Sequence, residues 1–330
     1  MIYILGKYRK NSRFLYFAAN LLRLCIPGFV YRLRRMWLLR PSQIEAARHL
    51  KLRADYYCKL DAPCKLGVEA SKFRFNLFGG HARNYQFDLG QYLRYWNRQF
   101  GTYYRMGDNT HILDVPTFTK ARVIEGDIRN LVLFNMDKVR HFDFVHDRFS
   151  YQSKKDQIVW RGPAYQLWRI EFLNRWFGHP RCDIGRTDKN SDGIHQRKPW
   201  MSITEQLNYK FILSIEGNDV ATNLKWIMSS NSLCFMTRPT KETWFMEGLL
   251  KPNYHYVMLK NDCSDLLEKM DYYLAHEKEA LAIIDNAQKW VAQFQNPRDE
   301  EIVSLLVLQK YFKMTGSILK KQPPKGGCFL

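Results

Sequence analysis

The chain has no paired cysteine motif, no long uninterrupted apolar run and few acidic residues. Its seven cysteines are scattered over 330 residues without CxxC spacing, which argues against a disulfide framework or a structural zinc site and favours a reducing compartment. No internal repeat and no long low-complexity linker occurs, so neither a repeat architecture nor extensive disorder is expected. The 32 acidic residues are outnumbered by 51 lysines and arginines. The net charge of +19 favours polyanionic partners such as nucleic acid, anionic lipids, lipopolysaccharide and nucleotide sugars.

The basic excess is concentrated at the N-terminus, where nine lysines and arginines precede the first acid, Glu45. Aromatic and leucine residues lie between these charges, but Arg23 and the pair Pro27 and Gly28 interrupt them. The run is therefore too short for a membrane-spanning helix of about 20 residues, and no small-residue cleavage site of a secretory signal follows it. Such a segment either lies in an anionic membrane interface or packs on the protein's own core. The first alternative predicts a cytoplasmic protein, peripheral on the inner face of the cytoplasmic membrane.

The hydrophobic pattern predicts an α/β chain in four parts. Residues 1–60 are expected to be a basic helical segment, 61–155 an α/β domain, 156–315 a second α/β domain, and 316–330 a flexible tail. In the first domain, the alternation of Phe73, Phe75 and Leu77 predicts a strand, and further strand-sized runs are THILDVP, ARVIE, LVLF and FDFVHD. In the second, helices are predicted over residues 164–178, 264–292 and 299–314.

Residues 205–260 are the most informative part of the sequence. An apolar run over 209–215 ends in the turn 216–219, a helical pattern covers 220–228, and a second apolar run covers 232–236. This order predicts a βαβ unit. Ligands of such units bind where a strand's carboxyl end meets the next helix, because free amide groups and the helix dipole attract anions. A plain helix start with Asn218 or Asp219 as N-cap is the alternative. The phosphate-binding residues expected in this loop are Gly217, Asn218, Asp219, Ala221 and Thr222.

Two carboxylates farther along this stretch, Glu242 and Glu247, flank Trp244 and Phe245. A carboxylate that accepts both ribose hydroxyls is common in nucleotide pockets, so one of the two is expected to bind a nucleoside. The histidines are separated and no clear DxD motif stands in a metal-binding context. No metal site is therefore expected.

Several motifs occur in the order that is typical of one known family: VWRGP at 159–163, EGNDVATNLKW at 216–226, SNSLCFM at 230–236, LLKPNYHYV at 249–257 and DCSDLLEKMDYYL at 262–274. Over roughly residues 100–295 the chain resembles glycosyltransferase family 90, which includes bacterial lipopolysaccharide-core transferases and eukaryotic protein O-glucosyl- and xylosyltransferases. RHFDFVHD, WRGP and ETWFMEG are similar to the bacterial, lipopolysaccharide core-modifying branch. The resemblance implies a GT-B-like fold, in which two Rossmann-like domains face a cleft. Residues 61–155 would bind the acceptor and 156–315 the nucleotide sugar.

The resemblance also implies an activity. It is that of a hexosyltransferase that moves a hexose from UDP-glucose or UDP-galactose to a lipopolysaccharide or lipooligosaccharide core acceptor, with inversion and with neither metal nor other cofactor. A transferase that acts on a protein or on capsular polysaccharide is an alternative, although the signal peptide and disulfide set of the protein-directed type are missing. A nucleic-acid-binding protein would also account for the charge, and it predicts basic and aromatic residues interleaved on one face.

Specific residues match the family's donor site. An Arg–Gly pair after a strand, and an arginine eight residues on, lie near the donor phosphates in the family, which corresponds to Arg161, Gly162 and Arg169. A guanidinium suits phosphate oxygens, and an ordinary salt bridge is the alternative for Arg169. Many relatives have an arginine six residues after the turn glycine, where this chain has Asn223. Lys225, two residues on, is expected to supply that charge instead.

The family's eukaryotic members use as catalytic base an aspartate just after a strand and close to a proline. Asp114 in THILDVP matches that position, and its carboxylate would take the proton from the acceptor hydroxyl. Asp127 in EGDIRN is the rival. A turn-capping role before Pro116 is the alternative for Asp114.

Overall fold

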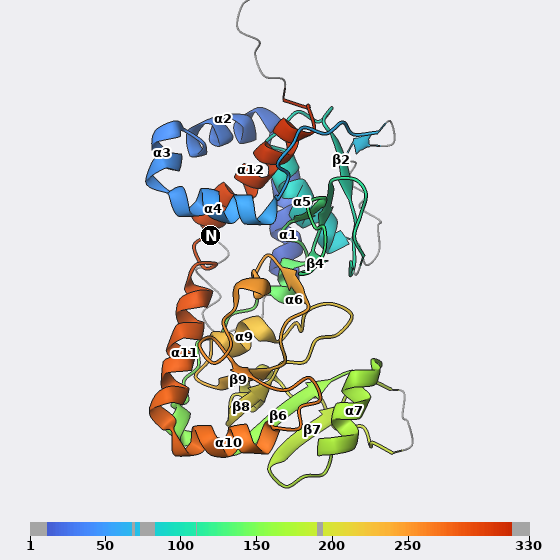
Figure 1. Ribbon diagram of the computed structural model, residues 1–330. Coiled ribbons are helices and arrows are strands. Elements are labelled where there is room, and N and C mark those ends of the chain that lie inside the picture. The colour runs from blue at the N-terminus through green and yellow to red at the C-terminus, as the bar shows by residue number, and fades with distance from the viewer. Residues whose placement is uncertain (1–11, 68–69, 73–82, 110, 190–193, 319–330) are drawn as a thin grey trace, which may run out of the picture. The chain divides into compact units, whose positions relative to one another are not determined.

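The computed structural model describes residues 12–67, 70–72, 83–109, 111–189 and 194–318. Its contacts divide the chain into two compact units. One contains Met1–Ala19 and Asp137–Pro297 and is called the 137–297 unit below; the other contains Asn20–Met136 and Arg298–Leu330 and is called the 20–136 unit. Both combine helices with parallel strands (Figure 1). The predicted mixed α/β class is thus confirmed.

The boundary between the units precedes the one that the sequence predicts near residue 155. FDFVHD, at residues 142–147, forms no strand. Instead, the buried carboxylate of Asp147 accepts hydrogen bonds from Lys154 Nζ at 2.7 Å and from the Asn231 amide at 2.9 Å. These contacts tie the segment to the 137–297 unit, since both partners belong to that unit.

The 137–297 unit is built on a five-stranded parallel sheet with the order β11-β9-β8-β6-β7. Strands β8 and β9 are almost wholly buried, which explains why they appear in the sequence as continuous apolar runs. The bounds are β6 Lys155–Gly162, β7 Cys182–Arg186, β8 Tyr209–Leu213, β9 Leu233–Met236, β10 Lys241–Thr243 and β11 Val257–Met258; α6 Lys138–His141, α7 Leu167–Trp176, α8 Ile203–Gln206, α9 Leu224–Met228, α10 Leu266–Ala275 and α11 Glu277–Ala292; and the 3-10 turns Tyr151–Ser153 and Glu247–Leu249.

The predicted βαβ unit is confirmed by β8, α9 and β9, in which the two strands pair in parallel. Two helix predictions need correction. The helix expected over 220–228 is a single turn of five residues, Leu224–Met228, because Asn223 Nδ2 holds the Leu213 carbonyl and keeps the preceding residues in a loop. The long helix expected over 264–292 breaks at His276, where the backbone leaves helical geometry at φ −117° and ψ 58°.

The 20–136 unit combines a four-stranded sheet, β1-β2-β3-β5, with helices from both ends of the chain. Strand β1 is antiparallel to β2, and the other pairs are parallel. The bounds are α1 Arg13–Leu24, which crosses the unit boundary, α2 Gly28–Leu38, α3 Pro41–Ala46, α4 Arg48–Tyr57, α5 Arg83–Leu93 and α12 Pro297–Met314, with β1 Ser71–Lys72, β2 Gly101–Tyr104, β3 Thr117–Thr119, β4 Ala121–Val123 and β5 Leu131–Leu133.

The last helix, α12, packs in the unit that contains the N-terminal helices. The Tyr311 ring lies 4.3 Å from that of Phe118, and its hydroxyl donates to the Pro116 carbonyl at 3.0 Å. Glu300 forms a buried ion pair with Arg53 at 2.7 Å. Helix α12 therefore closes the core of the 20–136 unit.

Two predicted strands are not observed in the first half of the chain. The strand expected at Phe73, Phe75 and Leu77 lies outside the described residues. THILDVP is a loop before β3 in its described part, because side chains take up its carbonyls in place of a neighbouring strand. Asn109 Nδ2 donates to the carbonyl of residue 111, Asn130 Nδ2 to that of residue 113, and Thr117 Oγ1 to that of residue 115.

Among the described residues, no single helix is long and apolar enough to cross a membrane. Helices α1 and α2 meet the length and composition criteria only together, as a pair bent by 101°.

Candidate functional site

The parallel sheet of the 137–297 unit reverses its winding between β6 and β8. The chain passes from β6 to β7 on one side, then returns across β6 to β8 and continues to β9 and β11 on the other. In open parallel sheets, ligands bind at such a switch point, outside the carboxyl ends of the strands. The two loops that meet here follow β6, at residues 163–166, and β8, at residues 214–223.

Arg169, on α7, joins these two loops. Its three nitrogens donate to the carbonyls of Pro163, Ile215 and Glu216 at 2.8, 2.7 and 3.0 Å. Its side chain is buried, and no carboxylate of the described residues forms an ion pair with it. Burial lowers the pKa of Arg169 to about 10, so the guanidinium stays charged at neutral pH. A buried cation without a counter-charge is costly unless an anion binds beside it.

The turn after β8 is shaped to admit this guanidinium. A Cβ atom at Gly217 would lie 3.3 Å from Arg169 Nη2, so glycine allows the close approach. Trp168 Nε1 also donates to the Glu216 carbonyl at 3.0 Å, and Gln166 Nε2 donates to Asn218 Oδ1 at 3.0 Å. The start of α7 is thereby fixed to the β8 turn.

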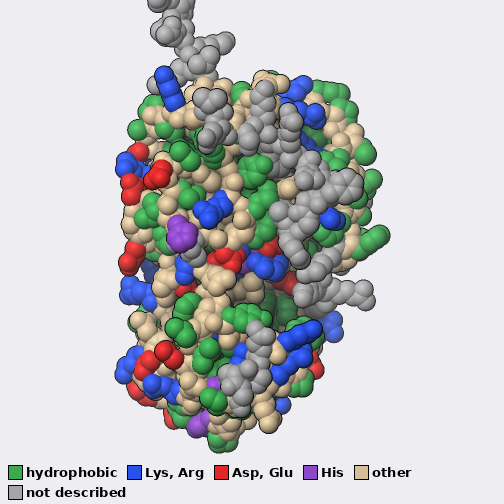
Figure 2. Space-filling view, turned by 90° about the vertical axis from the view of Figure 1, so that its right-hand side faces the viewer, with side chains coloured by type: hydrophobic (Ala, Val, Ile, Leu, Met, Phe, Trp, Pro, Cys, Tyr) green, Lys and Arg blue, Asp and Glu red, His purple; other side chains and the backbone are tan. Residues whose placement is uncertain are grey.

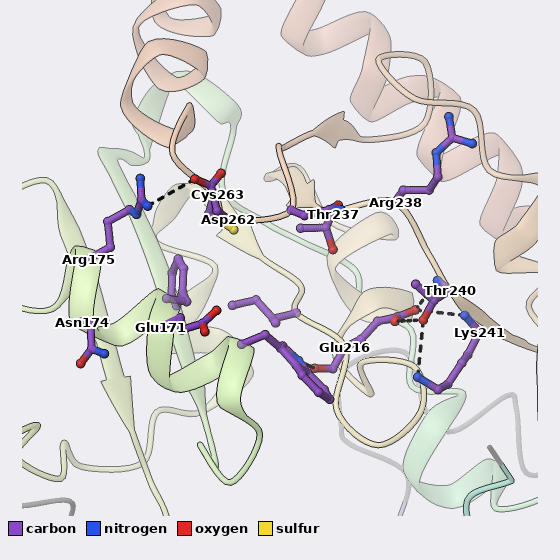
Figure 3. A pocket seen from close by; sticks show the side chains of 14 residues that line it. Glu171, Asn174, Arg175, Glu216, Thr237, Arg238, Thr240, Lys241, Asp262 and Cys263 are labelled. Carbon is purple, nitrogen blue, oxygen red and sulfur yellow. Dashed lines mark hydrogen bonds and ion pairs between the residues drawn. The ribbon is translucent and has the colours of Figure 1, made fainter.

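A pocket of about 710 Å³ opens at the carboxyl ends of β8, β9 and β11, against α7 (Figure 3). On one wall, Arg175 pairs with Asp262 at 3.2 Å; on another, Glu216 accepts hydrogen bonds from Thr240 and from the Lys241 amide. Its volume falls in the range of small-molecule sites. The lining residues are Trp168, Glu171, Phe172, Asn174, Arg175, Ile215, Glu216, Thr237, Arg238, Thr240, Lys241, Asn261, Asp262 and Cys263.

Arg238 and Lys241 bring further positive charge to this pocket. Within the described part of the chain, neither forms an ion pair, and Arg238 is exposed two residues beyond the end of β9. Sequence reasoning missed both, although the rule that ligands bind at the carboxyl ends of parallel strands points to residues in this position.

Arg161, at the end of β6, is held by a carboxylate that the sequence did not predict. Its Nη2 pairs with Asp183 Oδ1 at 2.7 Å, and Lys198 and Tyr209 donate to the same carboxylate. Burial opposes the ionisation of Asp183, but hydrogen bonds from Tyr209, Arg161 and Lys198 outweigh it and keep its pKa at about 2. Arg161 thus has a carboxylate partner within the unit, which it shares with Lys198.

Lys225 and Glu247 likewise form an ion pair with each other. Lys225 Nζ lies 2.6 Å from Glu247 Oε1, and the two side chains are 0% and 1% exposed. Glu247 also accepts hydrogen bonds from the amide and hydroxyl of Thr243. In this arrangement the charges of the two side chains balance each other in the core. This differs from the predicted roles of Lys225 toward phosphate and of Glu247 toward ribose, because the pair satisfies itself in the core.

We expect Lys225→Met to reduce the free energy of unfolding by about 3–5 kcal/mol, because it leaves the Glu247 carboxylate buried without a counter-charge. Lys225→Met combined with Glu247→Gln should cost clearly less, since the charge is removed from both sides. Urea denaturation measures both. If the Lys225→Met protein kept wild-type stability but lost affinity for a phosphate ligand, that result would instead support the predicted contact between Lys225 and phosphate.

The other residues predicted to bind the donor differ in their contacts and burial. Asn223 Nδ2 donates to the Leu213 carbonyl, and Asn223 Oδ1 accepts from Ser214, so this side chain fixes the loop. The Gly217 amide donates to the Asp219 carbonyl at 2.8 Å and is not available to a ligand. Gly162 ends β6 against the Trp160 ring. Of the others, Asn218 and Thr222 are exposed, and Asp219, Ala221 and Glu242 are buried.

Asp114 is exposed in the loop before β3, in the 20–136 unit. It therefore precedes a strand, whereas the sequence placed it at the end of one. The hydrogen bonds of Asn130 and Thr117 to the carbonyls on either side of it, at residues 113 and 115, hold the loop backbone.

Asp127 is bound by a neighbouring guanidinium. Arg129 Nε and Nη2 reach its two carboxylate oxygens at 2.9 and 2.7 Å, and the Arg129 amide adds a third hydrogen bond. These bonds lower the pKa of Asp127 to about 2. The Asp127 carboxylate is therefore already engaged by a guanidinium of its own loop.

The described residues contain no group of three or more histidine, cysteine, aspartate or glutamate side chains able to hold a metal ion. The positive charge at the switch point comes from arginine and lysine side chains.

The family model described as Glycosyl transferase family 90 matches residues 116–323, more than half of the chain. The O-glucosyltransferase LpsA of Dichelobacter nodosus is 42% identical over 274 residues, which cover 83% of this chain and 85% of that protein. Protein O-glucosyltransferase 3 of Homo sapiens is 29% identical over 174 residues, 51% of this chain and 34% of that protein. Uncharacterized protein 179R of Invertebrate iridescent virus 6 is 30% identical over 157 residues, 44% of this chain and 13% of that protein.

Proposed function

Because this chain belongs to glycosyl transferase family 90 and is a glycosyltransferase, we propose that it moves a glucosyl group from UDP-glucose to a hydroxyl of a lipopolysaccharide core acceptor. The resemblance to O-glucosyltransferase LpsA over most of both chains supports the choice of glucose. The observation that carries the donor site is Arg169, a buried cation that forms no ion pair with a carboxylate of the described residues, at the switch point of a parallel sheet.

The donor diphosphate is proposed to bind beside Arg169, at the edge of the adjoining pocket. Its two phosphates would supply the missing counter-charge, and Arg238 and Lys241 would contribute further cations from the pocket lining. Arg238 would thus provide the charge that many relatives supply at the position of Asn223. In this proposal Arg161 acts only by holding the end of β6, since Asp183 balances its charge.

The proposed chemistry is an inverting displacement. Asp114 takes the proton of the acceptor hydroxyl, and the acceptor oxygen forms a bond to the anomeric carbon on the face opposite UDP. The bond between that carbon and the diphosphate oxygen breaks, and its electron pair leaves with UDP. Positive side chains at the diphosphate stabilise the charge that develops there. With this charge supplied by the protein, we propose that the reaction needs no metal ion.

We further propose a GT-B arrangement, with the donor on the 137–297 unit and the acceptor on the 20–136 unit. Two features support it: each unit has its own sheet with parallel strands, and Asp114 belongs to a different unit from Arg169. A crystal structure in which UDP contacted only the 20–136 unit would contradict this assignment.

The alternative of nucleic-acid binding has less support. It predicts one contiguous basic face, whereas lysine and arginine side chains on the face in Figure 2 are interspersed with acidic and hydrophobic ones. Some of the lysines and arginines are also buried in ion pairs and absent from the surface, as at Lys154, Lys225 and Arg53.

The proposed function is tested by incubating the full chain with UDP-glucose or UDP-galactose and three acceptors: lipopolysaccharide core oligosaccharide, a capsular polysaccharide and a folded acceptor protein. We expect glucose to be incorporated into the core oligosaccharide, equally with and without EDTA, and mass spectrometry to detect one added hexose. If glucose were incorporated only into the protein or the capsular polysaccharide, that molecule would replace the lipopolysaccharide core as the proposed acceptor. Loss of activity in EDTA would refute metal independence. Absence of both donor binding and donor consumption would overturn the proposal.

Arg238→Gln is expected to raise KM for the UDP-sugar roughly tenfold or more, because one charged contact to phosphate is worth about 1.5–3 kcal/mol. Its side chain is exposed, so the melting temperature should stay unchanged. Arg181→Gln is the matched control, since Arg181 precedes β7 at the opposite edge of the sheet and pairs with Asp271. Equal kinetics of the two variants would exclude Arg238 from the donor site.

A further inference from the structure

Helix α2 exposes an apolar face. Phe29, Leu33, Met36 and Trp37 have between 41% and 64% of their surface exposed. Their spacings of four, three and one residues place them on the same side of the helix. In a soluble protein the apolar side of an amphipathic helix normally faces the core. Helix α2 instead keeps these four apolar side chains exposed, so this side of the helix is open to a partner.

The other side of α2 is fixed to the 20–136 unit. Tyr31 and Leu38 are buried, and the Tyr31 ring lies 5.0 Å from that of Tyr95. Arg35 Nη1 donates to the Tyr95 carbonyl at 2.8 Å, and its guanidinium lies 4.1 Å from the centre of the Trp96 ring. These contacts prevent α2 from turning its apolar side inward. They also keep one side of α2 on protein, which is incompatible with a helix surrounded by lipid.

The apolar surface continues onto the end of α1 and the turn before α2. Leu21, Leu22, Leu24 and Ile26 are 39% to 71% exposed. Because the two helices meet at 101°, the exposed residues belong to two differently directed helices and not to a single stripe. This set is called the α1–α2 surface: Leu21, Leu22, Leu24, Ile26, Phe29, Val30, Leu33, Met36 and Trp37.

Positive charge borders the α1–α2 surface. Arg32 and Arg40 are exposed and form no ion pair among the described residues, and Arg32 lies one turn before Met36, at the edge of the apolar side. Residues 12–44 contain no acidic side chain. Within the described part of the chain, the carboxylate that reaches this segment in an ion pair is that of Glu301, which lies 2.6 Å from Arg34. The rim is therefore complementary to an anionic partner.

We propose that the α1–α2 surface docks on an anionic lipid bilayer. Exposed apolar side chains bordered by arginines match the requirements of the membrane interface, where apolar groups enter the boundary of the acyl chains and guanidinium groups contact lipid phosphates. A protein partner would need shape complementarity, whereas a bilayer accepts irregular apolar side chains on two helices at an angle. The α1–α2 surface would hold the protein at the membrane, independently of its sugar-transfer site.

The test is co-sedimentation of the full chain with vesicles of phosphatidylcholine alone or mixed with phosphatidylglycerol. We expect binding to the mixed vesicles that weakens with salt, and little binding to phosphatidylcholine alone. Phe29→Ser with Leu33→Ser and Met36→Ser should lower the partition coefficient at least about tenfold. Arg32→Gln with Arg40→Gln should lower it at low salt and flatten its salt dependence.

Matched controls remove exposed residues of the same kinds elsewhere. Leu249→Ser with Tyr254→Ser and Leu281→Ser, and Lys189→Gln with Lys278→Gln, should bind vesicles as the wild type does. A wild-type circular dichroism spectrum and a cooperative thermal unfolding transition confirm that each variant is folded. If the triple Ser variant fails to fold, Phe29→Ser and Leu33→Ser are measured singly, and each should still weaken vesicle binding.

Three results would overturn the membrane proposal: no vesicle binding by the wild type, equal binding to neutral and mixed vesicles, or wild-type binding by folded Ser variants. A dimer of the wild type that the Ser variants convert to monomers, with no vesicle binding, would assign the surface to a second copy of the chain. Vesicle binding needs no donor sugar. The membrane proposal and the proposed sugar transfer can therefore fail independently of each other.

Discussion

Asp114→Asn is expected to lower the rate of sugar transfer by about 10²- to 10⁴-fold, the usual contribution of a general base. The side chain is exposed and the loop around it is held by other residues, Asn130 and Thr117. The free energy of unfolding should therefore be unchanged. The affinity for UDP should also be unchanged, since Asp114 belongs to the 20–136 unit and the donor is proposed to bind the other. Transfer is measured with UDP-glucose and core oligosaccharide, and UDP binding by calorimetry.

Asp127→Asn is the matched control, because it makes the same chemical change in the same unit. Arg129 Nε and Nη2 bind the two carboxylate oxygens of Asp127 at 2.9 and 2.7 Å, so this carboxylate is already engaged by a guanidinium. We expect the Asp127→Asn protein to keep nearly the wild-type rate. If Asp127→Asn greatly lowered the transfer rate and Asp114→Asn did not, Asp127 and not Asp114 would be the catalytic base.

Arg169→Lys is expected to lower kcat/KM for the UDP-sugar by about 10²- to 10³-fold, comparable to the loss of one key electrostatic group from an active site. Lysine keeps the charge but lacks the planar fork, so it cannot reach Pro163, Ile215 and Glu216 together. The decisive readout is a comparison of UDP with uridine. Affinity for UDP should fall and affinity for uridine should hold, because the residue is proposed to act on the phosphates.

Arg53→Lys is the control for a purely structural effect. Arg53 is also a buried arginine, but Glu300 balances its charge in the 20–136 unit. Its replacement should reduce stability without changing the ratio of UDP to uridine affinity. If Arg169→Lys likewise reduced stability and left that ratio unchanged, its role would be to join the loops after β6 and β8 and not to bind the donor.

Local patterns carried most of the correct predictions. The apolar runs at 209–215 and 232–236 became β8 and β9, and the helical pattern at 164–178 became α7. Each depends on residues that are neighbours in sequence, so the period of the pattern is enough to identify the element. THILDVP shows the limit of this approach, because its carbonyls are taken by the side chains of Asn109, Thr117 and Asn130. The sequence does not indicate that these side chains, and not the backbone of a neighbouring strand, donate hydrogen bonds to the carbonyls.

The sequence by itself determined the α/β class, the βαβ unit and a family of enzymes that handle a negatively charged donor. It also supplied three candidate cations for that donor: Arg161, Arg169 and Lys225. Only the tertiary structure decided which of them is available. Asp183 neutralises Arg161 and Glu247 neutralises Lys225, in both cases from 22 residues away. Such pairing depends on which segments the fold brings side by side, and a carboxylate's distance along the chain does not reveal it. Among the described residues, Arg169 alone of the three has no carboxylate partner, because its donors meet neutral carbonyls at the ends of two parallel strands.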